Sequence, residues 1–115
     1  MTTTNVPKQS TKWLIIILTL LTALIHFSRA AADPEIRVLF LLNGLAYLIL
    51  VAAYYAPVPV LQRQNRRIRS VFIAFTLLTI VLYFVWVAMS GEWNTPIGPI
   101  DKIIEILLVI LLWRS

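Results

Sequence analysis

Apolar residues in this chain form long stretches separated by short polar ones. Charged residues are absent from positions 13–28, 38–62 and 70–91, which hold 16, 25 and 22 residues. A helix gains about 1.5 Å per residue, so about 20 residues cross the ~30 Å hydrocarbon core of a bilayer. The pattern therefore predicts membrane-spanning helices over about 13–32, 34–56 and 69–90.

A fourth apolar segment, residues 97–113, carries Asp101, Lys102 and Glu105 in its first half. We predict that it also spans the membrane. The expected fold is an all-α, integral membrane bundle of four transmembrane helices over residues 13–115, preceded by a polar, disordered cytoplasmic tail over residues 1–12.

Turn residues mark the helix boundaries. Asp33, Pro34 and Glu35 form a typical helix start, with a capping side chain, a proline in the first turn and an acid near the positive end of the helix dipole. Pro57 and Pro59 end the second segment, because proline cannot continue a helix hydrogen-bond ladder.

Composition supports the membrane class and excludes several chemistries. Hydrophobic residues make up 60% of the chain and charged residues 13%, against about half and about a quarter in soluble domains. The chain has no Cys, which excludes disulfides, thiolate nucleophiles and Cys-ligated metals. Its single His leaves no multi-His metal site and little for a Ser-His-Asp triad, so we expect no enzymatic activity.

The basic residues predict the orientation. The N-terminal tail, the connector with Arg63, Arg66, Arg67 and Arg69, and Arg114 carry seven of the ten Lys and Arg residues and none of the acids. By the positive-inside rule, both termini lie on the cytoplasmic side of the cell membrane. Anionic lipid accounts for the net charge of +5, so no nucleic-acid partner is expected.

Three of the predicted helices each have a polar face at helical spacing. These faces consist of Thr19, Thr22, His26 and Arg29; of Asn43, Tyr47 and Tyr54; and of Thr76, Thr79, Tyr83 and Ser90. Polar side chains avoid lipid, so the faces are expected to contact other helices, either within this chain or in neighbouring subunits.

Five side chains are predicted to lie in the same outer leaflet, namely His26, Asn43, Asp101, Lys102 and Glu105, and Arg29 and Arg37 complete a seven-residue candidate cluster as possible ion-pair partners. Charges inside a membrane are usually paired or functional. Lys102 can reach Glu105 at i,i+3, and Arg29 or Arg37 can meet an acid across the bundle. The group is either a structural ion-pair cluster or a site for a quinone, a proton or a pigment.

His26 is a possible axial ligand for haem or for a chlorophyll-type magnesium, with Met89 as a second haem ligand. The alternative is a histidine that only forms hydrogen bonds. The sequence requires no cofactor and assigns no metal site.

Two motifs carry a resemblance. The run from Leu42 to Leu48, with Asn43-Gly44, and the run from Thr95 to Glu105 resemble those of uncharacterised small four-helix membrane proteins of bacteria and haloarchaea. Those proteins tend to have Gly at the position of Ala46 and an aromatic residue at the position of Pro99. The resemblance implies that Asn43, Asp101, Lys102 and Glu105 belong to a shared pattern, and it implies no activity.

The chain is similar in size to the small multidrug-resistance transporters, whose coupling acid lies in the first helix, but residues 13–28 contain no acid. We therefore expect a non-catalytic accessory subunit that packs against other integral membrane subunits of a larger complex, such as an electron-transfer or photosynthetic one. The alternatives are a small homo-oligomeric transporter and a quinone- or pigment-binding membrane protein.

Overall fold

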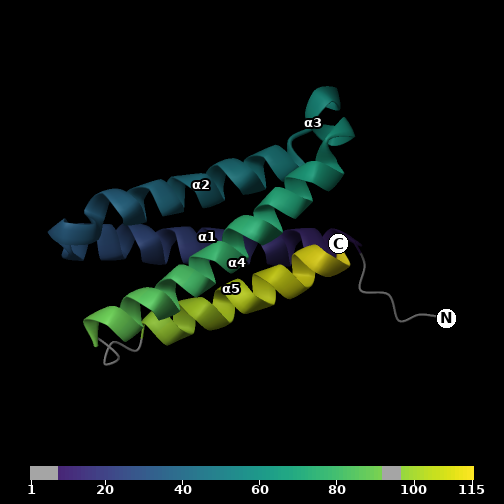
Figure 1. Cartoon of the computed structure of the whole chain (residues 1–115). Coiled ribbons are helices and arrows are strands. Elements are labelled where there is room, and N and C mark those ends of the chain that lie inside the picture. The colour runs from purple at the N-terminus through teal and green to yellow at the C-terminus, as the bar shows by residue number, and fades with distance from the viewer. Residues whose placement is uncertain (1–7, 92–96) are drawn as a thin grey trace.

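The computed structural model describes residues 8–91 and 97–115, which form helices joined by short turns (Figure 1). The long helices are α1 (Lys8–Ala32), α2 (Arg37–Tyr55), α4 (Asn65–Ser90) and α5 (Ile97–Arg114), and the short ones are the 3-10 turn η1 (Pro34–Ile36) and the single-turn α3 (Pro59–Arg63). The described part of the chain contains no strand, so the all-α class is confirmed.

Three helical segments are long and apolar enough to cross a membrane: Gln9–Ala32, Pro34–Tyr55 and Asn65–Ser90. They match the three stretches without charge in the sequence. By composition alone α5 does not join this group, because Asp101, Lys102, Glu105 and Arg114 lie within its 18 residues.

The long helices run alternately in opposite directions (Figure 1). α1 packs on α2 and α5, and α4 packs on the same two helices, so α1 and α4 lie on opposite sides of the bundle. The η1 end of the molecule holds the turn between α1 and α2 and the start of α5. The opposite, α3 end holds the start of α1 and the end of α5 (Figure 1). From the α3 end toward the η1 end, α2 and α4 diverge in this view.

Local contacts explain the turn between α1 and α2. The Asp33 side chain accepts a hydrogen bond from the Glu35 amide (3.2 Å), which caps η1 as the sequence predicts. Arg37 Nε donates to the Ala30 carbonyl (2.9 Å) at the negative end of the α1 dipole. The guanidinium therefore closes the turn.

The structure differs from the sequence prediction at three boundaries of the α3 end, one of which is the start of α4 at Asn65 instead of residue 69. α1 begins at Lys8, so residues 8–12 of the predicted tail are helical, and residues 1–7 lie outside the described residues. Lys12 Nζ lies over the ring of Tyr55 (5.5 Å), a cation–π contact that holds this first turn against α2. Pro59 starts the unpredicted α3, because proline fits the first turn of a helix.

The half of the interior nearer the α3 end is a packed apolar core. Its buried side chains are those of Ile15, Val51, Phe72, Leu108 and Leu112. The outward surface of the long helices is apolar too, as at Leu24, Leu45, Val81 and Ile103.

The closest helix pair, α1 and α2, depends on Gly44. A Cβ atom at this position would lie 2.9 Å from Phe27 Cε1, nearer than carbon atoms pack. Glycine therefore lets the two helices approach.

Candidate functional site

The polar faces of α1, α2 and α4 turn toward the interior of the bundle. Thr19, Thr22, His26, Tyr47, Thr76 and Thr79 are all buried. Thr19 and Thr76 satisfy their hydroxyl groups on their own helices, by donating to the Ile15 carbonyl (2.7 Å) and the Phe72 carbonyl (2.8 Å). Partners for these faces are thus present within the chain.

Lys102 on α5 is the centre of the buried charges. Its ammonium forms ion pairs with Asp101 (3.3 Å to Oδ2) and with Glu105 Oε1, the i,i+3 partner expected from the sequence. It also lies over the ring of Tyr83 on α4, 5.0 Å from the centroid. Three neighbours therefore surround the three N–H groups of Lys102.

The two carboxylates of α5 also bind hydroxyl groups from other helices. Tyr47 of α2 donates to Glu105 Oε2 (2.5 Å), and Thr22 of α1 donates to Asp101 Oδ1 (2.5 Å). Hydrogen bonds to ionised groups are about twice as strong as neutral ones. The acids of α5 thus join three helices, and we call Thr22, His26, Tyr47, Asp101, Lys102 and Glu105 the polar cluster.

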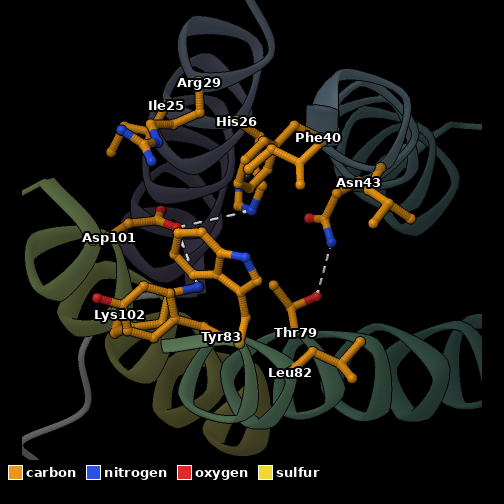
Figure 2. Close-up of a pocket in the computed structure, with 14 residues that line it drawn as sticks. Ile25, His26, Arg29, Phe40, Asn43, Thr79, Leu82, Tyr83, Asp101 and Lys102 are labelled. Atoms are coloured by element: carbon orange, nitrogen blue, oxygen red, sulfur yellow. Dashed lines mark hydrogen bonds and ion pairs between the residues drawn. The ribbon is translucent and has the colours of Figure 1, made fainter. Parts of the chain in front are cut away.

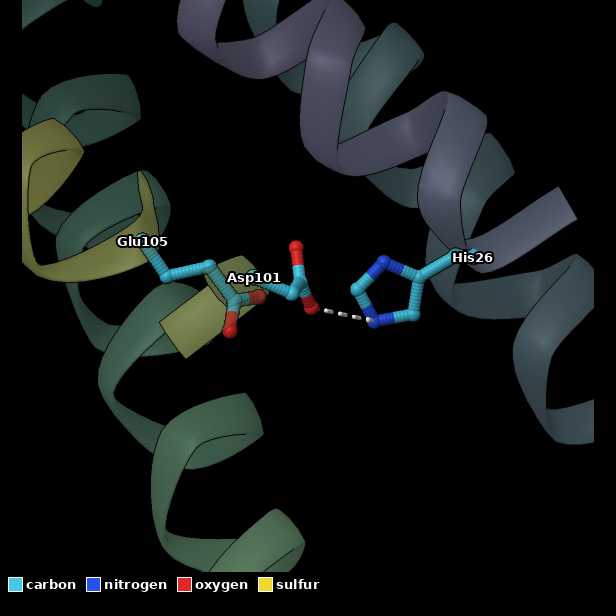
Figure 3. Close-up of side chains that lie close together, drawn as sticks. All are labelled: His26, Asp101 and Glu105. Carbon is cyan, nitrogen blue, oxygen red and sulfur yellow. Dashed lines mark ion pairs between the residues drawn. The ribbon is translucent and has the colours of Figure 1, made fainter. Parts of the chain in front are cut away.

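His26 has an orientation that fixes one of its protons. Its Nδ1 lies 2.7 Å from the Thr22 carbonyl, which can only accept a hydrogen bond, so Nδ1 carries hydrogen. Nε2 faces Asp101 Oδ2 at 3.8 Å (Figure 3), an ion-pair distance when the ring is protonated and too long for a direct hydrogen bond. Nε2 is therefore the ring atom available to a further partner.

His26, Asp101 and Glu105 each offer a ligand atom within 4.8 Å of the others (Figure 3), which is the spacing of a candidate metal site. One imidazole and two carboxylates suit a divalent cation. The Lys102 ammonium, however, already contacts both carboxylates. A metal ion would have to displace this charge.

A pocket of about 200 Å³ lies beside the polar cluster, at the η1 end between α1, α2, α4 and α5 (Figure 2). Its lining combines apolar and aromatic side chains with six polar or charged ones, and consists of Ile25, His26, Arg29, Ile36, Leu39, Phe40, Asn43, Thr79, Leu82, Tyr83, Trp86, Gly98, Asp101 and Lys102. Ligand pockets typically have this composition.

Gly98 brings the start of α5 against α4 at the pocket wall. A Cβ atom at position 98 would lie 2.8 Å from Tyr83 Cε1. The absence of a side chain therefore allows the Tyr83 ring to lie between Gly98 and the Lys102 ammonium.

The side-chain amide of Asn43 has a hydrogen-bond partner for its nitrogen but none for its oxygen among the described residues. Its Nδ2 donates to Thr79 Oγ1 (3.2 Å), whereas its buried Oδ1 has no hydrogen-bond partner among the described residues. Figure 2 shows the amide nitrogen directed to Thr79 and the oxygen directed toward the middle of the pocket.

Six of the seven predicted site residues thus lie in the pocket wall or the polar cluster: His26, Arg29, Asn43, Asp101, Lys102 and Glu105. The two arginines differ from the prediction. No ion pair joins Arg29 or Arg37 to either acid within residues 8–91 and 97–115, because Lys102, Thr22 and Tyr47 already serve the carboxylates. Arg37 instead closes the turn to α1, and Arg29 lines the pocket.

The sequence assigned four further residues of the site only to polar helix faces: Thr22, Tyr47, Thr79 and Tyr83. Their roles depend on how the helices are rotated against each other. Phe40 and Trp86 of the pocket had no signal beyond hydrophobicity. The haem interpretation gains nothing from the geometry, because Met89 is 83% exposed and the pocket is far smaller than a porphyrin.

Comparisons with protein-family models, with curated proteins and with solved structures found no match for this chain. The functional argument therefore depends on the site itself.

Proposed function

We propose that this chain is an integral protein of the cell membrane in which α5 forms a fourth span. The 18 residues of α5 extend about 27 Å at 1.5 Å per residue, close to the thickness of the hydrocarbon core. Its three central charges are buried inside the bundle, whereas Ile100, Ile103 and Ile110 face outward. Average hydropathy undervalues such a helix because its charges never meet lipid.

We further propose that the α3 end is cytoplasmic, because Arg63, Arg66, Arg67 and Arg114 gather there. Cysteines replacing Gln64 and Glu35, both exposed, test this in a chain without native cysteine. In intact cells an impermeant thiol reagent should label Glu35→Cys and spare Gln64→Cys. The reverse pattern would invert the orientation.

The function that the site supports best is the binding of a small lipophilic molecule that has a polar group. The pocket of about 200 Å³ next to a buried charged network is the observation that carries this proposal. A dry cavity of about 150 Å³ already holds a benzene ring. Ionisable groups inside a membrane are by default candidates for a functional site.

The ligand is expected to enter from the lipid between α2 and α4. Leu39 of α2 and Leu82 of α4 line the pocket and are also 68% and 54% exposed, so they form its mouth. Toward the α3 end the described interior is closed by apolar packing around Phe72, Leu108 and Leu112. This arrangement supports ligand binding in one half of the membrane. It does not support a polar transport path through the bundle.

Filling the mouth tests the proposal. Leu39→Trp with Leu82→Trp places two indoles at exposed positions of the pocket, and Leu45→Trp is the matched control on a lipid-facing site of α2 that does not line it. Mass spectrometry of organic extracts should find one lipophilic compound, near one per chain, in the wild type and the control. The filled variant should lose most of it. Equal content in all three proteins, at equal yield and helicity, would refute ligand binding.

The accessory-subunit hypothesis stays a prediction. The sequence argument for foreign subunits depended on three polar faces, and these contact partners within the chain. Particle size after extraction in mild detergent tests the hypothesis. A particle containing several different membrane subunits would support it, and one that contains this chain alone would refute it.

A further inference from the structure

We infer that the ligand of the pocket is a neutral, hydroxyl-bearing ring compound, with its hydroxyl group donating a hydrogen bond to Asn43 Oδ1. This inference rests on the proposed function and names the class of ligand for the same site.

The Asn43 amide is fixed by its neighbour. Thr79 has a single hydroxyl proton, which it donates to the Phe75 carbonyl (3.0 Å). Thr79 Oγ1 can therefore only accept from Asn43, so the amide must turn its nitrogen to Thr79 (3.2 Å). The carbonyl oxygen is left as a buried acceptor without a partner in the described part of the chain, directed toward the middle of the pocket (Figure 2).

Several other protons near the pocket already have acceptors. Thr22 donates to Asp101, His26 Nδ1 donates to the Thr22 carbonyl, and Lys102 is engaged by two carboxylates and one ring. Among the pocket-lining residues that the structure describes, Asn43 Oδ1 is the buried side-chain atom that has no hydrogen-bond partner. A buried acceptor left unsatisfied is unfavourable, so the pocket selects a donor.

Charge and shape favour a hydroxyl group over an ammonium as this donor. Two cationic side chains, Arg29 and Lys102, line the pocket against one acid, Asp101, so the net charge of the wall disfavours a cationic ligand. Phe40 and Trp86 offer aromatic surface for a flat ring, which prefers offset or edge-to-face contacts. Phenols and quinols combine a ring of suitable size with a hydroxyl donor.

Two matched probes test the inference: 4-hexylphenol and its methyl ether 4-hexylanisole, which lacks only the donor. Binding to the full chain is measured by calorimetry in phosphatidylcholine nanodiscs, with empty nanodiscs subtracting partition into lipid. The wild type should bind the phenol about tenfold more tightly than the ether, since one hydrogen bond to a buried group gives about this factor. The doubly filled variant Leu39→Trp/Leu82→Trp should bind neither.

Two variants test whether Asn43 is the cause of the preference for the phenol over the ether. Asn43→Leu removes the acceptor at similar volume and should bring the two affinities within about twofold. Thr79→Val removes the hydroxyl that holds the Asn43 amide, so the amide can turn and donate its N–H group to the ether oxygen. This variant keeps Asn43 but should bind the phenol and the ether with more similar affinities than the wild type does. Circular dichroism confirms folding of each variant.

Equal saturable binding of phenol and ether by the wild type, abolished by filling the mouth, would overturn this inference and leave ligand binding intact. A water molecule would then satisfy Asn43. Tighter binding of 4-hexylbenzylamine than of the phenol would overturn it in favour of a cation. No saturable binding of either probe would also overturn it, and the extracts of the mouth variants decide ligand binding independently.

Discussion

The two halves of the bundle interior are built from different interactions. Toward the α3 end, Ile15, Phe72 and Leu108 belong to a buried, largely apolar cluster. Toward the η1 end, the polar cluster holds α1, α2 and α5 together through short, directional contacts, and a pocket remains beside it. Apolar packing fills space, whereas a network of polar contacts can support an open pocket, because its bonds do not require contact on every side.

The comparison also separates stability from recognition. Residues of the apolar half have packing roles, while in the polar half His26, Asp101 and Lys102 both connect the helices and line the pocket. Substitutions in the two halves should therefore differ in kind as well as in size.

The largest effect is expected for Glu105→Ala. This variant leaves the Lys102 ammonium with one buried acid and the Tyr47 hydroxyl without an acceptor, and breaking a buried pair in this way costs about 3–5 kcal/mol. Unfolding in detergent, followed by circular dichroism, measures the loss, with the exposed Ile106→Ala as the control on the same helix. Glu105→Gln should lose less, because the amide oxygen still accepts from Tyr47. Unfolding of both Glu105 variants at the wild-type midpoint would show that the cluster is solvated.

In the apolar half, Leu108→Ala should lower the free energy of unfolding by about 2–5 kcal/mol through the cavity that it creates. Its affinity for 4-hexylphenol should remain within about twofold of the wild type, since Leu108 does not line the pocket. Calorimetry and unfolding on the same preparation measure both quantities. A large loss of affinity would show that the two halves are coupled.

Two tyrosine-to-phenylalanine variants, one in each half of the bundle, compare the two halves through the loss of a single hydroxyl group. Tyr47→Phe removes a hydroxyl that donates to a buried carboxylate and should cost about 1.5–3 kcal/mol. Tyr54→Phe removes one that pairs with Ser115 at the α3 end (2.6 Å), where water can replace it, and should cost about 0.5–1 kcal/mol. Similar unfolding midpoints for the two variants would contradict the difference between the halves.

The sequence predicts the long helices and the inward polar faces well, for a simple reason. A membrane segment must satisfy its own backbone and present apolar side chains to lipid, so charge-free stretches such as 38–62 coincide with helices long and apolar enough to span. Pairing within one helix, as between Lys102 and Glu105, follows from spacing alone.

Contacts between helices were less accessible to sequence reasoning. Whether Asp101 meets an arginine or the Thr22 hydroxyl depends on which helices are neighbours and on a rotation of a few tens of degrees. Arg37 was expected at an acid, but at the first position of α2 it lies closer to the free carbonyls of α1. The pocket arises from the divergence of α2 and α4, which no single segment encodes (Figure 1).

The close approach of Gly98 to Tyr83 has an evolutionary consequence. Any side chain at position 98 would collide with the ring that covers the Lys102 ammonium. Among homologous sequences, positions 83 and 98 should therefore covary. Homologues with tyrosine at position 83 should keep glycine at position 98, and lineages that acquire alanine or serine there should carry a smaller residue at 83. In those lineages Lys102 would lose the aromatic ring that covers its ammonium. The substitutions at positions 83 and 98 would then show in which lineages this contact of the pocket wall was kept.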